Sequence, residues 1–131
     1  MPGETDLDKI LKSLNPELSE EEYIFCTYKN RSPKLIESDS WAIIQEQEGT
    51  TYILERRKAE KYQIEFESVF KRITIKIFSS LNAVGLTAVI SRRLANLGIS
   101  ANIVSGYFHD HIFIPTEKAN EAKRAIEEIQ Q

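Results

Sequence analysis

The segment "FKRITIKIF" (70–78) most strongly limits the folds open to this chain. Its three isoleucines, at positions 73, 75 and 77, alternate with Arg72, Thr74 and Lys76. Side chains on a strand point to opposite faces in turn, so this period of two predicts a β-strand. One of its faces should be buried, while the other is wet or only partly covered. Such a strand needs an amphipathic partner layer on one side only.

The rest of the second half supplies that layer. A helix with Gly98 just past its end, the strands "ISANIVSGY" (99–107) and "HIFIP" (111–115), and a C-terminal helix capped by Thr116 are predicted. The apolar face of the first helix is formed by Leu86, Val89, Ile90, Leu94 and Leu97, and that of the second by Ala119, Ala122, Ile126 and Ile129. The order β-α-β-β-α predicts an α+β, ferredoxin-like unit, with an antiparallel sheet and helices on one face. The usual closing strand is missing, and the first half either supplies it or forms a companion sheet.

The first half is predicted as a short helix to about Ser13 with Thr5 and Asp8 as its cap pair, a strand at 22–28 and a loop at 29–40. A hairpin turning at Glu48-Gly49 and one or two helical turns at 56–62 follow. Residues 1–65 carry 9 basic and 14 acidic side chains, against 8 and 6 in residues 66–131, which favours two tandem subdomains, 1–65 and 66–131.

Composition narrows the possible partners. The net charge of −3 and pI of about 5.5 give no electrostatic footprint for nucleic acid. No apolar run is long enough to cross a membrane, and the N-terminus lacks the pattern of a secretory signal. Cys26 is the only cysteine, so no internal disulfide can form, and it is predicted to be a buried packing residue. We therefore expect a cytoplasmic protein without a cofactor.

The stretch "YFHDHIF" (107–113) holds both histidines of the chain, His109 and His111, on either side of Asp110. In the hairpin interpretation, residues 108–111 connect two strands and both histidines are exposed beside a turn acid. A metal site would need more ligands than this motif provides. A general base would need a nucleophile and an orienting group. The remaining alternative is contact with a ligand, through imidazoles whose charge changes near neutral pH.

The loop "SSLNAVGLTAV" (79–89) joins a strand to a helix, with Gly85 near the helix N-terminus. Backbone N–H groups at such a position can hold a carboxylate, and a glycine lets a ligand approach closely. The alternative is a plain loop whose glycine serves conformation alone. The predicted ligand-binding residues are Ser79, Ser80, Leu81, Asn82, Ala83, Val84, Gly85, Leu86, Thr87, Ser105, His109, Asp110 and His111; no catalytic or metal-binding residue is predicted.

Residues 73–115 resemble an ACT domain, a small-molecule regulatory module. The motifs "GETDL" (3–7), "FCT" (25–27), "SSLNAVGLTA" (79–88) and "GYFHDHIF" (106–113) resemble short bacterial proteins with two ACT-like units. The aspartokinase regulatory region is a more distant likeness. Many ACT domains have Asp-x-Pro-Gly where this chain has residues 82–85. The glycine is kept, whereas the acid and the proline are not.

The resemblance implies amino-acid binding at an interface between ACT units, through backbone capture of a carboxylate, and often dimers. The leading hypothesis is therefore a non-enzymatic regulatory module that binds an amino acid and forms a homodimer. A protein–protein interaction module without a metabolite ligand is the second hypothesis. A small enzyme or metal-binding protein that uses His109 or His111 is the third.

Overall fold

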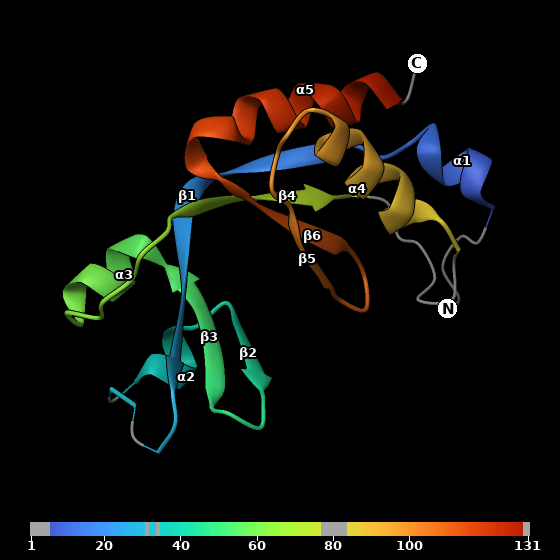
Figure 1. The fold of residues 1–131 in the computed structure, drawn as a ribbon. Helices are drawn as coiled ribbons and strands as arrows, with labels where there is room; N and C mark the ends of the chain where they lie inside the picture. The colour runs from blue at the N-terminus through green and yellow to red at the C-terminus, as the bar shows by residue number, and fades with distance from the viewer. Residues whose placement is uncertain (1–5, 31, 34, 77–83, 130–131) are drawn as a thin grey trace. The chain divides into compact units, whose positions relative to one another are not determined.

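The computed structural model describes residues 6–30, 32–33, 35–76 and 84–129. Within them, six strands are hydrogen-bonded in the order β2-β3-β1-β4-β6-β5 (Figure 1). The pairs β1–β3, β2–β3 and β5–β6 are antiparallel. The chain forms two compact units: residues 1–20 with 71–131, called unit 1, and residues 21–70, called unit 2. The predicted α+β class with antiparallel strands and helices is confirmed, whereas the division at residue 65 stays a prediction.

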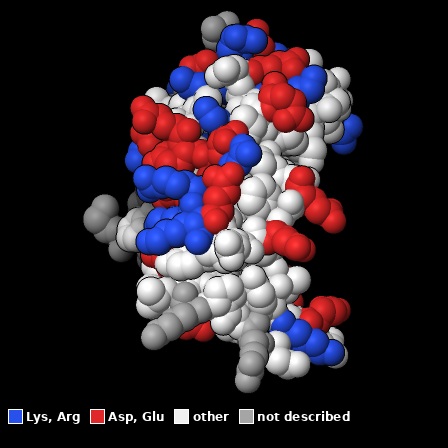
Figure 2. Space-filling model, turned by 90° about the vertical axis from the view of Figure 1, so that its left-hand side faces the viewer, with Lys and Arg blue, Asp and Glu red and all other residues white. Residues whose placement is uncertain are grey.

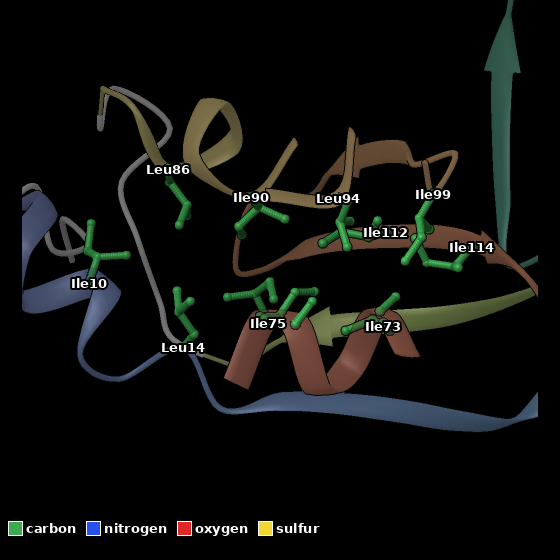
Figure 3. Packing of buried hydrophobic residues seen from close by; sticks show 13 residues of the cluster. Ile10, Leu14, Ile73, Ile75, Leu86, Ile90, Leu94, Ile99, Ile112 and Ile114 are labelled. Atoms are coloured by element: carbon green, nitrogen blue, oxygen red, sulfur yellow. The ribbon is translucent and has the colours of Figure 1, made fainter. Parts of the chain in front are cut away.

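Unit 1 contains α1 (Leu7–Leu11), the first residues of β1 (Pro16–Tyr28), β4 (Phe70–Ile75) after its first residue, α4 (Leu86–Asn96), β5 (Asn102–Ser105), β6 (Asp110–Pro115) and α5 (Ala119–Ile129), which follows the 3₁₀ turn Thr116–Lys118. The three helices pack on one face of the strands. That packing buries a single core cluster (Figure 3), whose members include Ile10, Leu14, Ile73, Ile75, Leu86, Ile90, Leu94, Ile112, Ile114 and Ile126.

The closing strand of unit 1 comes from the N-terminal part of the chain. β1 is the hydrogen-bonded neighbour of β4. The Lys76 N–H donates to the carbonyl of Leu14 at 3.1 Å, and the Arg72 N–H donates to Ser19 Oγ at 2.9 Å. Of the two alternatives left open by the sequence, the first half therefore supplies the strand. α1 and β1 bring Ile10 and Leu14, both fully buried, into the same core.

Unit 2 contains the remainder of β1, α2 (Ile36–Asp39), β2 (Ala42–Gln45), β3 (Thr50–Glu55) and α3 (Arg56–Lys61). Ile24, Tyr52 and Leu54 share a strand face, because Ile24 lies opposite Leu54 and Cys26 opposite Tyr52. Residues of both helices, Ile36 and Ala59, pack on that face. Both units thus cover one sheet face with helices.

The surface of α3 carries charges of both signs. Arg56 pairs with Glu22 at 3.1 Å and with Glu60 at 3.4 Å, and Lys58 pairs with Glu55 at 3.8 Å. Figure 2 faces this side of the molecule and shows basic and acidic side chains interspersed. Exposed pairs of this kind add little stability. No helix among the described residues is long and apolar enough to cross a bilayer.

Several local predictions are wrong. Asp6, whose carboxylate accepts from the Asp8 and Lys9 N–H groups, caps α1, and the predicted cap Thr5 lies outside the described residues. The predicted loop 29–40 contains α2, and the strand predicted at 22–28 begins at Pro16. Leu97, predicted on the buried face of α4, is 42% exposed, because it lies just past the end of that helix at Asn96. Thr116 does not cap α5 with its side chain: Oγ1 is buried without a hydrogen-bond partner.

Other local predictions are confirmed. The two hairpins form where expected, and Gly98, at φ +71°, follows the end of α4 in the left-handed conformation. Cys26 packs against the unit 2 core as expected, but it is half-buried and not fully buried as predicted; this burial raises the pKa of its thiol.

Replacing Leu14 by Ala should lower the free energy of unfolding by about 2–5 kcal/mol, since it leaves a cavity in the unit 1 core. Leu97→Ala is the matched control, because that leucine is largely exposed; its cost should stay within about 0.5 kcal/mol. Urea titrations of both variants measure the difference. Equal losses would show that the N-terminal segment is not part of the core.

Candidate ligand site at the α4 N-terminus and the β5–β6 corner

Gly85 is the N-cap residue of α4 and has a φ of +100°, a conformation that favours glycine. A Cβ built on Gly85 would lie 3.0 Å from Cδ2 of Leu7 in α1. As a glycine, it brings no side chain to cap the helix, whose eleven residues align their dipole towards this end. The backbone at this end of α4 therefore has the geometry and polarity to receive an anionic group.

The residues around Gly85 differ in what they offer. Val84 is 83% exposed and Thr87 is exposed, so both face solvent. Leu86 is buried in the unit 1 core, so only its backbone is available to a ligand. The predicted site residues Ser79, Ser80, Leu81, Asn82 and Ala83 lie outside the described residues.

The second predicted part of the site is the corner between β5 and β6. The turn comprises residues 106–109 and is closed by the Gly106 N–H, which donates to the carbonyl of His109 at 2.9 Å. Ser105 lies opposite Asp110, and Val104 lies opposite His111. His111 is therefore a strand residue. The prediction of two exposed histidines is wrong, because both side chains are partly buried. Their ring centroids lie 6.5 Å apart.

A chain of polar contacts holds the His111 ring. Thr74 Oγ1 lies 3.0 Å from His111 Nδ1, and Arg72 Nε donates to the same hydroxyl at 3.2 Å. Arginine can only donate, so Thr74 accepts from it and has its own hydrogen to give. If the Thr74 hydroxyl accepts from Arg72 and donates to His111, Nδ1 of the imidazole is the acceptor. The proton of the neutral ring then lies on Nε2. Thr74 and Arg72 were not predicted as site residues, although their alternation with the isoleucines of β4 places them on one face.

The environment of His111 keeps its ring neutral. Burial, followed by the positive charge of Arg72, lowers its pKa from the ordinary 6.5 to about 4, and His109 and Lys76 act in the same direction while Asp110 opposes them. A cation is disfavoured in a half-buried place beside another cation. The hypothesis that His111 changes charge near neutral pH is therefore wrong. His111 can offer a ligand a hydrogen bond but not a positive charge.

The contact between Thr74 and His111 has the form of a nucleophile beside a base. Thr74 is only 6% exposed, however, so the hydroxyl is poorly accessible to a substrate. Among the described residues, no three His, Cys, Asp or Glu side chains come close enough together to hold a metal ion. The described geometry thus favours a positioning role for this pair.

The lowered pKa of His111 predicts a pH dependence of stability. Between pH 6.5 and about 4 the unfolded chain binds a proton at this residue that the folded chain does not, so stability should fall as the pH falls through this window. His111→Gln keeps an acceptor for Thr74 but cannot be protonated. Thermal melts across the window should show a shallower loss for this variant, and parallel curves would contradict the assignment.

Two ACT domain models match the sequence, at residues 2–71 and 67–128. The sequence has no significant match among curated proteins. Among solved structures, a protein of unknown function from Vibrio cholerae, described as a possible transport protein, is 40% identical, with a TM-score of 0.85 over 97% of this chain and 98% of that one.

The regulatory subunit of aspartate kinase from Thermus thermophilus has the same fold at 14% identity, with a TM-score of 0.67 over 92% of this chain and 99% of that one. An aspartokinase with alpha and beta subunits matches at 15% identity and a TM-score of 0.65, over 87% and 95% of the two chains. The family matches, together with the two helix-covered units, lead to one conclusion: the chain belongs to the ACT domain family and has its domains in tandem.

Proposed function

We propose that this protein is a regulatory module that binds an amino acid, or a similar small anion, at an interface between ACT units. It acts without catalysis of its own, as a homodimer in the cytoplasm. The regulatory role is supported by the family and by the shared fold of the aspartate kinase regulatory subunit. The ligand and the interface are inferences from the chemistry of unit 1.

The observation that carries the proposal is Gly85 at the start of α4. Its φ of +100° favours glycine, and the residue brings no side chain of its own to cap the helix, so in this proposal the carboxylate takes the place of a side-chain cap. Anions are stabilised at this end by the backbone N–H groups and the helix dipole. Thr87 adds a hydroxyl on the first turn, and its side chain is exposed.

The β5–β6 corner would border this pocket in the proposal. Ser105 is exposed, and Asp110 is only partly buried, so a hydroxyl and a carboxylate are within reach of solvent. A carboxylate at the rim suits the amine of an amino acid. The neutral ring of His111 adds a hydrogen-bonding group, oriented by Thr74.

A thermal-shift screen against the amino acids tests the proposal. A ligand that binds only the folded state stabilises it, by about 2.7 kcal/mol when its concentration is one hundred times its Kd. The melting temperature therefore rises. At least one amino acid should raise the melting temperature in a concentration-dependent way. No shift with any of them would contradict amino-acid binding.

Gly85→Ala identifies the site once the screen has given a ligand. Gly98→Ala is its matched control, because Gly98 lies at the other end of α4, also at positive φ, with nothing within 4 Å of an added Cβ. Each change should cost roughly 1–2 kcal/mol of stability through backbone strain. Only Gly85→Ala should also weaken the ligand, as measured by calorimetry on folded protein. Equal affinities in the two variants would remove Gly85 from the site.

The second candidate is an interaction module without a metabolite ligand. It is favoured by exposed apolar side chains, because Tyr107 and Phe108 are 60% and 63% exposed at the β5–β6 turn, with ring centroids 5.0 Å apart. A negative ligand screen together with capture of a defined protein partner would favour it. An enzyme using His109 or His111 ranks third, since the hydroxyl beside His111 is buried.

A further inference from the structure

Four large apolar side chains are exposed in the described part of unit 1: Val84, Leu97, Tyr107 and Phe108. Val84 directly precedes the N-cap residue of α4, whereas Leu97 follows the last residue of that helix. Tyr107 and Phe108 occupy the β5–β6 turn. Single exposed apolar residues are ordinary on a protein surface, but a group of them in one place often marks a binding surface. The place of the turn relative to α4 is therefore decisive.

The β5–β6 turn lies at the end of unit 1 where α4 begins. α4 ends at Asn96 and β5 begins at Asn102, so the strand runs back along the helix. The eleven residues of α4 span about 16 Å and the four residues of β5 about 13 Å, so the strand returns to the level of the helix start. Figure 1 shows the turn and the start of α4 both towards the right of the view. Three of the four exposed side chains thus lie at this end of unit 1, whereas Leu97 lies at the other end of α4.

A polar pair next to the turn lies on the side of the sheet that the helices cover. Ser105 lies opposite Asp110, and Ile103 lies opposite Ile112. Residues two positions apart on a strand share a face. Because Ile103 and Ile112 pack in the unit 1 core beneath the helices, Ser105 and Asp110 lie on the same face, at the end where α4 begins. A carboxylate that suits an amine and a helix end that suits a carboxylate therefore meet at one end of unit 1.

The charges near this end do not favour a ligand whose side chain is charged. Arg72 and Lys76 alternate with the core isoleucines of β4, so they lie on the face opposite to the helices. α1, which packs beside the N-cap residue of α4, uses Asp6 to cap itself and exposes Asp8 and Lys9, which have opposite charges. An apolar ligand side chain finds exposed apolar partners here, whereas a charged one finds no surface of a single sign.

We propose that the ligand of unit 1 is an amino acid with a large apolar side chain, aromatic or branched aliphatic. Its carboxylate lies at the backbone N–H groups that begin α4, its amine faces Asp110, and its side chain covers Tyr107 and Phe108. These two rings are in edge-to-face contact, with centroids 5.0 Å apart, and offer a surface against which a further apolar group can pack. Small-molecule sites commonly combine apolar walls with a few convergent polar groups. The inference rests on the proposed function and narrows it to one ligand class.

Calorimetry with single amino acids tests the ligand class. L-phenylalanine and L-leucine are the apolar probes, and L-serine, L-aspartate and L-lysine have the same carboxylate and amine but polar or charged side chains. Burial of a large apolar side chain favours binding by a factor of about ten or more. At least one apolar probe should therefore bind about tenfold more tightly than any of the three polar probes.

Variants of the turn locate the side-chain contact. Tyr107→Ser combined with Phe108→Ser should weaken binding of the better apolar probe about tenfold, because the apolar surface is lost. Tyr107→Leu combined with Phe108→Leu keeps an apolar surface and should retain most of the affinity. Leu97→Ser is the matched control at the other end of α4 and should bind like the wild type. All three positions are exposed, so the variants should fold, as circular dichroism and thermal melts would verify.

The possible results separate this inference from the proposed function. Tighter binding of a polar probe than of either apolar probe would overturn the apolar class and leave amino-acid binding standing. Apolar binding that the double serine variant does not weaken would also overturn the inference, and would assign Tyr107 and Phe108 to a protein partner. An absence of binding by any amino acid would overturn both.

Discussion

The addition of the N-terminal segment to β4 is the interaction on which the rest of unit 1 depends. Among the described residues from 70 onward there are three strands, β4, β5 and β6. Leu14 and Ile10 complete the unit 1 core, and the backbone bonds of Lys76 and Arg72 fix the segment in place. Because β1 continues into unit 2 from Glu21, the two units share one continuous strand.

At the start of α4, the groups that we propose for ligand binding belong mainly to the backbone. Gly85 tolerates a left-handed conformation, and Leu86 anchors the first helical turn in the core. Between residues 84 and 87, the polar groups at this end belong to the main chain and to Thr87. A site of this kind would discriminate by charge and shape more than by side-chain chemistry, which suits the proposed regulatory module and its carboxylate ligand.

The polar face of β4 has a different role from its apolar face. Thr74 joins Arg72 to His111 and orients the imidazole, while burial and the charge of Arg72 lower the pKa of the ring. A histidine in this setting is a positioned hydrogen-bonding group. The motif "YFHDHIF" therefore owes its properties to a strand more than thirty residues earlier in the chain, which no local pattern of the motif reveals.

The sequence by itself determined the fold class, both hairpins, the second-half helices, and the conformation of Gly98, because periodicity and turn chemistry are local properties. Only the tertiary structure decided the remainder. The source of the closing strand, the burial of His111 and the exposure of Leu97 depend on which segments meet. A side chain at Gly85 would meet Leu7, a residue almost eighty positions earlier in the chain. Burial and pKa are sums over spatial neighbours, and a linear pattern does not name those neighbours.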